Sequence, residues 1–331
     1  MAYRLKAGES VAENVRRIVG EEVDSATALL DKNHSKSRDE AVHEARKSIK
    51  KIRGLLRLVR PELGRAFGEE NKRFRDIGRQ LSQIRDATAL LEIFEDVLRE
   101  RKQALDGNRF AALRRGLKRE KQKTDEQLDI EKVIQRASGT LHSAARRLKT
   151  WPLHDGGFGA IESGLKQTYR DGRKALAKAE KTKDPLDFHD FRKRVKDHWY
   201  HVRLLESLWT GVMQAHEASL KELETWLGND HNLVMLREKV EAEPEEFGSP
   251  EEVKVFLAVA GQYQEELRAN SLSLGHRIYA EKPKVFAREI NRLWDAWQHQ
   301  PEGMKQIEKS QRDPSAKRPA SSAGKVKASA A

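Results

Sequence analysis

The sequence HEARKSIK at residues 43–50 is repeated as HDFRKRVK at residues 189–196, 146 positions further along the chain. The same offset places LSQIRD (81–86) on LGNDHN (227–232), and it holds from about residue 15 to about residue 90. A constant offset over this length predicts two structurally equivalent halves. Because a histidine within a run of basic residues is what recurs, the repeat indicates a paired surface for binding anions.

Each copy of the motif is predicted to lie on a helix with one basic face. At about 100° per residue, a helix over 37–60 places the first set of cations on the side of His43 and the apolar side chains opposite. A helix over 185–209 repeats this arrangement around His189. The cations of the two faces are Arg46, Lys47, Lys50, Arg53, Arg57, Arg192, Lys193, Lys196 and Arg203. Solvation of a charged helix face is the simpler explanation. Like charges four residues apart repel one another, however, and solvation gives no reason for that arrangement to occur twice.

The overall composition favours a polyanionic partner. The 331 residues include 64 Lys and Arg against 52 Asp and Glu, a formal net charge of +12. The absence of cysteine excludes disulfides, thiolate metal sites and cysteine nucleophiles. The N-terminal segment has no apolar signal region, and no stretch is long and apolar enough to span a membrane. We therefore expect a cytoplasmic protein.

Helix signals cover the chain to about residue 299, and strand signals are nearly absent. Capping patterns begin at Ser10, Ser37 and Ser249, and Asp184 precedes a first-turn proline. The segment 151–157 divides the halves. The predicted helices are 9–33, 37–60, 65–82, 86–105, 108–127, 129–149, 157–182, 185–209, 212–228, 231–241, 250–280 and 283–299. Residues 300–331 carry basic residues but almost no bulky apolar ones, so a disordered basic tail is expected there.

The second repeated segment is predicted to lie where one helix ends and another begins. Gly228 is expected to cap the end of a helix, and Asp86 and Asn232 to cap the starts of the helices that follow. Arg85 and His231 would then lie beside helix N-termini, where free N–H groups favour an anion such as phosphate.

Enzymatic and metal-binding motifs are missing from the sequence. There is no P-loop, no GxGxxG, no GxSxG and no HExxH. The neighbouring cations disfavour a metal ion at the three histidines His43, His189 and His231, whose helix faces carry no carboxylates of their own. We expect no metal, no cofactor and no catalytic activity.

The quoted residues resemble the CHAD family (conserved histidine α-helical domain). The resemblance rests on AVHEARKSIKKIRGLLRLVRPELG and LSQIRDATALLE in the first half, and on TYRDGRKAL, FHDFRKRVKDHWYHVRLLESLW and LGNDHNL in the second. It covers residues 3–299, with repeats at 3–150 and 151–299. It implies an all-α fold of two antiparallel helical bundles, related by a pseudo-twofold axis around a central basic groove or pore. It also implies binding of inorganic polyphosphate, association with polyphosphate granules and no catalysis.

The predicted polyphosphate contacts are the two basic faces with Arg85 and the three histidines, and the hydroxyls of Tyr169 and Tyr200 are added as donors. The TYRDGRKAL segment adds Arg170 and Arg173, although Asp171 between them weakens that edge. Two alternatives stay open. One is a helical protein that binds nucleic acid, and the other is an enzyme that acts on polyphosphate. Oligomeric state and protein partners cannot be predicted.

Overall fold

The computed structural model describes residues 3–31, 38–102, 107–154 and 156–299. Within these ranges the chain forms helices and no β-strand, so the all-α prediction is confirmed. The predicted tail at 300–331 and the Ser37 cap lie outside the described residues. The α-helices are α1 (Val11–Asp31), α2 (Arg38–Leu58), α3 (Arg60–Leu63), α4 (Arg65–Gln80), α5 (Ser82–Glu100), α6 (Ala111–Gln127), α7 (Ile130–Arg147), α8 (Gly159–Thr182), α9 (Pro185–Leu204), α10 (Thr210–Ala242), α11 (Pro250–Ile278) and α12 (Pro283–Gln298). Short 3-10 turns are η1 (Gly107–Phe110), η2 (Leu148–Thr150), η3 (Glu206–Leu208) and η4 (Pro244–Phe247).

Three of the predicted caps are present. The backbone N–H of Ser10 donates to Glu13 Oε2 at 2.7 Å, and the backbone N–H of Glu13 donates to Ser10 Oγ at 3.2 Å. Ser249 forms the same reciprocal box at the start of α11. The Asp184 side chain accepts from a backbone N–H in the first turn of α9. Local sequence therefore determines where these helices begin.

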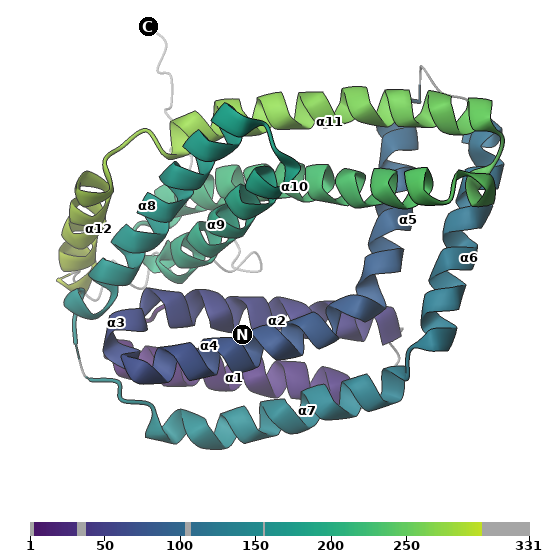
Figure 1. The fold of residues 1–331 in the computed structure, drawn as a ribbon. Helices are drawn as coiled ribbons and strands as arrows, with labels where there is room; N and C mark the ends of the chain where they lie inside the picture. The colour runs from purple at the N-terminus through teal and green to yellow at the C-terminus, as the bar shows by residue number, and fades with distance from the viewer. Residues whose placement is uncertain (1–2, 32–37, 103–106, 155, 300–331) are drawn as a thin grey trace, which may run out of the picture.

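Helices separated by the sequence offset make corresponding contacts within each half. α1 and α2 pack together, as do α8 and α9 at the same positions of the second half. α5 packs on α6, and the corresponding second part of α10 packs on α11. The corresponding helices also meet across the halves, because α2 contacts α9 and α5 contacts α10 (Figure 1).

The predicted helix break at residues 228–231 is wrong. α10 continues through it, so Gly228 does not end a helix, Asn232 does not begin one, and His231 lies in mid-helix. The backbone of Gly228 is not in the positive-φ region. A Cβ there would lie 3.3 Å from Arg192 Nε, so the glycine leaves room for that arginine. In the first half the chain does turn, at Leu81, but α5 begins at Ser82, so Asp86 is inside the helix and not a cap.

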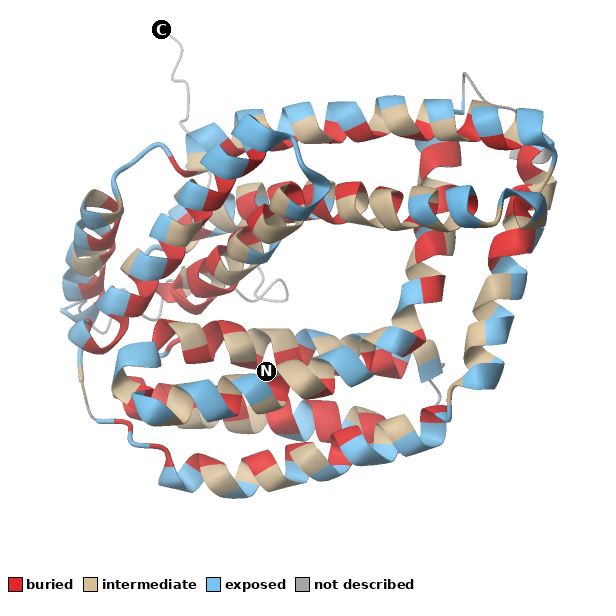
Figure 2. Ribbon diagram, viewed as in Figure 1, coloured by how far each residue is buried: buried red, intermediate tan, exposed pale blue. Residues whose placement is uncertain are grey.

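The hydrophobic core has two parts, and each part uses both halves of the chain. The larger part joins α1, α2, α4 and α7 to α8, α9, α12 and the first part of α10. The smaller part joins α5 and α6 to α11 and the second part of α10. There, Phe256 of α11 contacts Phe94 of α5, with ring centroids 5.3 Å apart, and Phe110, at 5.7 Å. Buried residues lie on the inward faces of these helices, and exposed residues lie outward (Figure 2). The segment near residue 151 is therefore not a boundary between separate cores.

α2 and α9 cross at close range at equivalent positions. Gly54 of α2 faces Tyr200 of α9, and a Cβ on Gly54 would lie 2.8 Å from the Tyr200 Cβ. Beside it, His201 Nε2 lies 2.9 Å from the carbonyl oxygen of Gly54, to which it donates. This close contact holds the two motif-bearing helices side by side.

Candidate anion-binding groove

The two basic faces meet in a cavity of about 320 Å³ between α2 and α9. Both helices contribute its walls. The lining residues are Lys50, Arg53, Arg57, Arg192, Lys193, Arg194, Lys196, Asp197 and Tyr200. We call the basic side chains of α2 the first wall and those of α9 the second wall; Arg46, one turn before Lys50 on α2, belongs to the first wall but is not among the residues that line the cavity.

The first wall contains cations that have no carboxylate in contact. Among the described residues, Arg46 and Lys50 make no hydrogen bond and no ion pair, and Arg46 Nε is buried without a partner. Burial, with Lys196 and Arg46 nearby, holds the pKa of Lys50 well below its usual range. Burial also lowers the pKa of Arg46, against the opposing effect of Asp86. Positive charge is thus concentrated here, and the carboxylates that offset it act from a distance without contact.

The remaining cations of α2 are engaged locally. Arg53 Nε donates to Asn71 Oδ1 at 3.2 Å, and Lys47 Nζ pairs with Glu44 at 2.9 Å. Arg57 Nε pairs with Asp197 Oδ2 of α9 at 3.1 Å and so links the two walls.

The second wall is neutralised by a carboxylate that the sequence did not reveal. Glu224 of α10 is buried, and its Oε1 lies 2.6 Å from Lys196 Nζ and 3.4 Å from Arg192. Its Oε2 lies 2.9 Å from Lys221 Nζ. Together with Asp197 on α9 itself, it corrects the expectation that the basic faces lack carboxylates. Asp197 was visible on the helix wheel, but Glu224 is not part of any repeated pattern.

The three site histidines, His43, His189 and His231, do not form one cluster by contact. The rings of His189 and His231 are in contact, with centroids 4.0 Å apart and planes tilted by 37°. Burial and then the adjacent His189 lower the pKa of His231 to about 4. Desolvation, with neighbouring cations, also lowers the pKa of His43 and of His189. All three side chains are therefore mainly neutral at pH 7 in the free protein.

The structure places several other predicted contacts away from the cavity. Tyr169 is buried in the core, and its hydroxyl donates to the carbonyl of Ile278, so it is not an available donor. Tyr200 lines the cavity but is 3% exposed. Arg85 lies in the first turns of α5 and pairs with a glutamate there.

The arginines of α8 and the end of α9 are also engaged elsewhere. Arg173 donates to the carbonyl of Glu281, and Arg170 donates to Gln167 Oε1 at 3.2 Å. Arg203 pairs with Glu217 at 3.0 Å. None of the three arginines lines the cavity between the walls.

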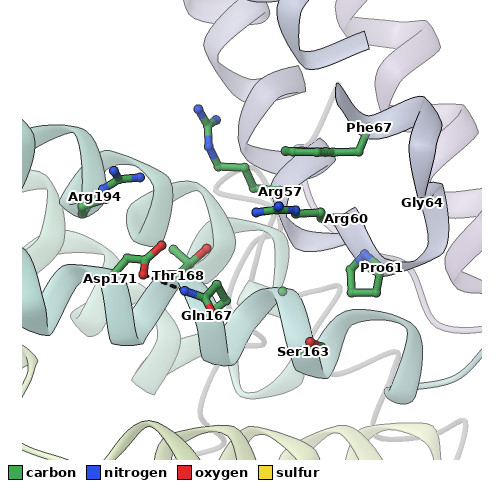
Figure 3. A pocket seen from close by; sticks show the side chains of 11 residues that line it. Arg57, Arg60, Pro61, Gly64, Phe67, Ser163, Gln167, Thr168, Asp171 and Arg194 are labelled. Atoms are coloured by element: carbon green, nitrogen blue, oxygen red, sulfur yellow. Dashed lines mark hydrogen bonds between the residues drawn. The ribbon is translucent and has the colours of Figure 1, made fainter. Parts of the chain in front are cut away.

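A second cavity, of about 480 Å³, shares Arg57 and Arg194 with the first. Figure 3 shows it between the α3–α4 segment, which carries Arg60 and Phe67, and α8, which carries Asp171. The Arg60 guanidinium lies over the Phe67 ring, 4.9 Å from its centroid. With three arginines and one aspartate in its lining, this cavity extends the positive region beyond the two walls.

In the part of the chain that the structure describes, no three His, Cys, Asp or Glu side chains form a group that could hold a metal ion. In the same part of the chain, none of the helices is both long and apolar enough to cross a membrane.

Comparisons with known proteins agree with the sequence resemblance. The CHAD domain family model matches residues 18–241. Among curated proteins, none matches this sequence. The crystal structure of the CHAD domain from the plant Ricinus communis is similar, with a TM-score of 0.61 and 18% sequence identity. The match covers 85% of this chain and 95% of the plant chain, and it shows a shared fold.

Proposed function

This chain belongs to the CHAD domain family, and from that membership together with the basic cavity we propose that it binds inorganic polyphosphate. The polymer lies between the two walls, contacts their arginines and lysines, and continues toward the second cavity. Arg supplies forked donors to pairs of phosphate oxygens, and Lys supplies a point charge. The protein acts by binding, without hydrolysis, and associates with polyphosphate granules.

The observation that carries this proposal is the pair of unpartnered cations Arg46 and Lys50. Burying these two cations beside Arg192 and Lys196 is unfavourable when no carboxylate contacts either of them, as the depressed pKa of Lys50 indicates. A bound phosphate supplies the missing counter-charge. A single small anion carries too few negative charges to pair with the cations of both walls. A polyphosphate chain pairs with many cations at once, and the counterions bound to the chain are released.

The test is a titration with polyphosphate of defined length at several salt concentrations. We expect affinity to rise with chain length and to fall steeply with salt. Arg46→Ala/Lys50→Ala should weaken binding by at least about tenfold, since each lost charge-assisted contact is worth roughly 1.5–3 kcal/mol. Arg115→Ala/Lys118→Ala on α6 is the matched control, because both side chains are exposed and far along the chain from the walls. Equal binding of triphosphate and a chain of about a hundred phosphates would contradict the multivalent mechanism.

Two further measurements address the alternatives. Competition with RNA at equal phosphate concentration tests nucleic-acid binding, which relies on exposed aromatic platforms for the bases. Tyr200 is buried, and Arg203 and Lys221 both lie over the ring of Trp199, which disfavours such stacking. Phosphate release with magnesium or manganese tests hydrolysis, and colocalisation with granules in cells tests the proposed association.

A further inference from the structure

The two walls share an arginine and a lysine at equivalent positions but differ in the counter-charges of these residues. Lys196 and Arg192 of the second wall contact the buried carboxylate of Glu224 at 2.6 and 3.4 Å. The equivalent residues of the first wall are Lys50 and Arg46. The residue equivalent to Glu224 is Gly78 of α4, which has no side chain to offer.

The carboxyl group of Glu224 stays ionised in the folded protein. Burial alone would raise the pKa of Glu224, but Lys196, Arg192 and Lys221 together hold the pKa below its ordinary range. The carboxylate is 5% exposed, so solvent ions screen it little. The second wall therefore already holds one anion before any ligand arrives.

Another carboxylate, Asp86, lies near the first wall but does not form direct ion pairs with its cations as Glu224 does at the second wall. Asp86 is exposed and makes no hydrogen bond or ion pair with described residues. Although the residue as a whole is exposed, neighbouring atoms desolvate its carboxyl in part and raise the pKa of Asp86, against the effect of Arg46 and Lys50. Its charge acts on Arg46 from a distance, whereas Glu224 directly contacts three cations.

We infer that Glu224 is a built-in counter-anion that makes the second wall secondary, so that polyphosphate is held mainly by Arg46 and Lys50 of the first wall. This inference rests on the proposed function. A phosphate at the first wall gains a direct ion pair, because no protein carboxylate contacts those cations and Asp86 and Glu224 act on them only from a distance. A phosphate at the second wall shares Lys196 and Arg192 with Glu224, and like charge repels it.

The first experiment compares Lys50→Ala with Lys196→Ala, which are matched by the 146-residue offset. In the wild-type background we expect Lys50→Ala to weaken polyphosphate binding about tenfold and Lys196→Ala about twofold. Glu224→Gln should then tighten binding and raise the cost of Lys196→Ala to about tenfold. Equal costs of the two lysine variants in the wild-type background would overturn the inference. Weaker polyphosphate binding by a folded Glu224→Gln protein would also overturn the inference.

The second experiment introduces a carboxylate at the first wall and leaves the contacts of Glu224 with its three cations intact. A Cβ at Gly78 would meet only the Ile49 Cγ2, at an ordinary 3.5 Å, so the position has space for a side chain. Gly78→Glu should weaken binding about tenfold, and Gly78→Gln, its uncharged control, should weaken it much less. Equal effects of Glu and Gln would contradict a role for charge. A wild-type protein that binds no polyphosphate at all would instead refute the proposed function.

Discussion

Acid should destabilise this protein through His201, the histidine at the crossing of α2 and α9. Burial lowers the pKa of His201 from 6.5 to about 4, although the bond to the Gly54 carbonyl opposes this. The folded state therefore prefers the neutral ring, and the unfolded chain takes up a proton first as the pH falls. Stability from this group is complete above the unfolded pKa and is lost as the pH falls from about 6.5 toward 4. From these two pKa values, the free energy of unfolding should fall by about 2 kcal/mol between pH 7 and pH 5.

The assay is urea unfolding at pH 7 and at pH 5 for the wild type and for His201→Gln. Glutamine keeps an N–H donor for Gly54 but cannot take up the proton. The free energy of unfolding of the wild type should fall by about 2 kcal/mol more than that of the variant over this range. The buried His198, whose pKa is also lowered, is present in both proteins and cancels in the comparison. Parallel pH dependence in the two proteins would refute this reasoning.

Three other predictions concern packing, an ion pair and binding. Gly164→Ala would place a Cβ against the carbonyl oxygen of Leu58, so it should lower the free energy of unfolding by about 1–3 kcal/mol in urea titrations; an unchanged midpoint of urea unfolding would contradict the close contact. Arg57→Ala leaves Asp197 without its ion-pair partner and should cost about 3 kcal/mol of stability, which Arg57→Ala/Asp197→Asn should partly restore. Polyphosphate binding should tighten as the pH falls below about 6.5, because a bound polyanion favours protonation of the three site histidines. Calorimetric titrations of a variant with all three changed to Asn should show a smaller pH effect.

The helical fold and the pairing of the two motif helices followed from sequence because both depend on local or repeated signals. Caps such as Ser249 and Glu252 act within one turn, and they appear as predicted. The offset that aligned residues 43–50 with 189–196 identified α2 and α9 as equivalent, and their cations line one cavity.

The errors arose where tertiary contacts override local preference. Glycine is typical of a helix end, but α10 continues through Gly228, where the missing side chain leaves room for Arg192 of α9. Tyr169 lies beside basic residues in the sequence, yet its ring is stacked on Phe286 in the core, with centroids 4.3 Å apart. Glu224 could not be found from the repeat, since Gly78 stands at the equivalent position.

The aromatic contacts of Phe256 with Phe94 and Phe110 make the halves of this molecule interdependent. A fragment ending near residue 150 would present the apolar sides of α5 and α6 to water, and its complement would do the same with α11. The duplicated sequence thus encodes one cooperative unit, in which neither copy is complete by itself. The spacing of the two basic walls is consequently set by an interlocked framework and not by a hinge between independent modules.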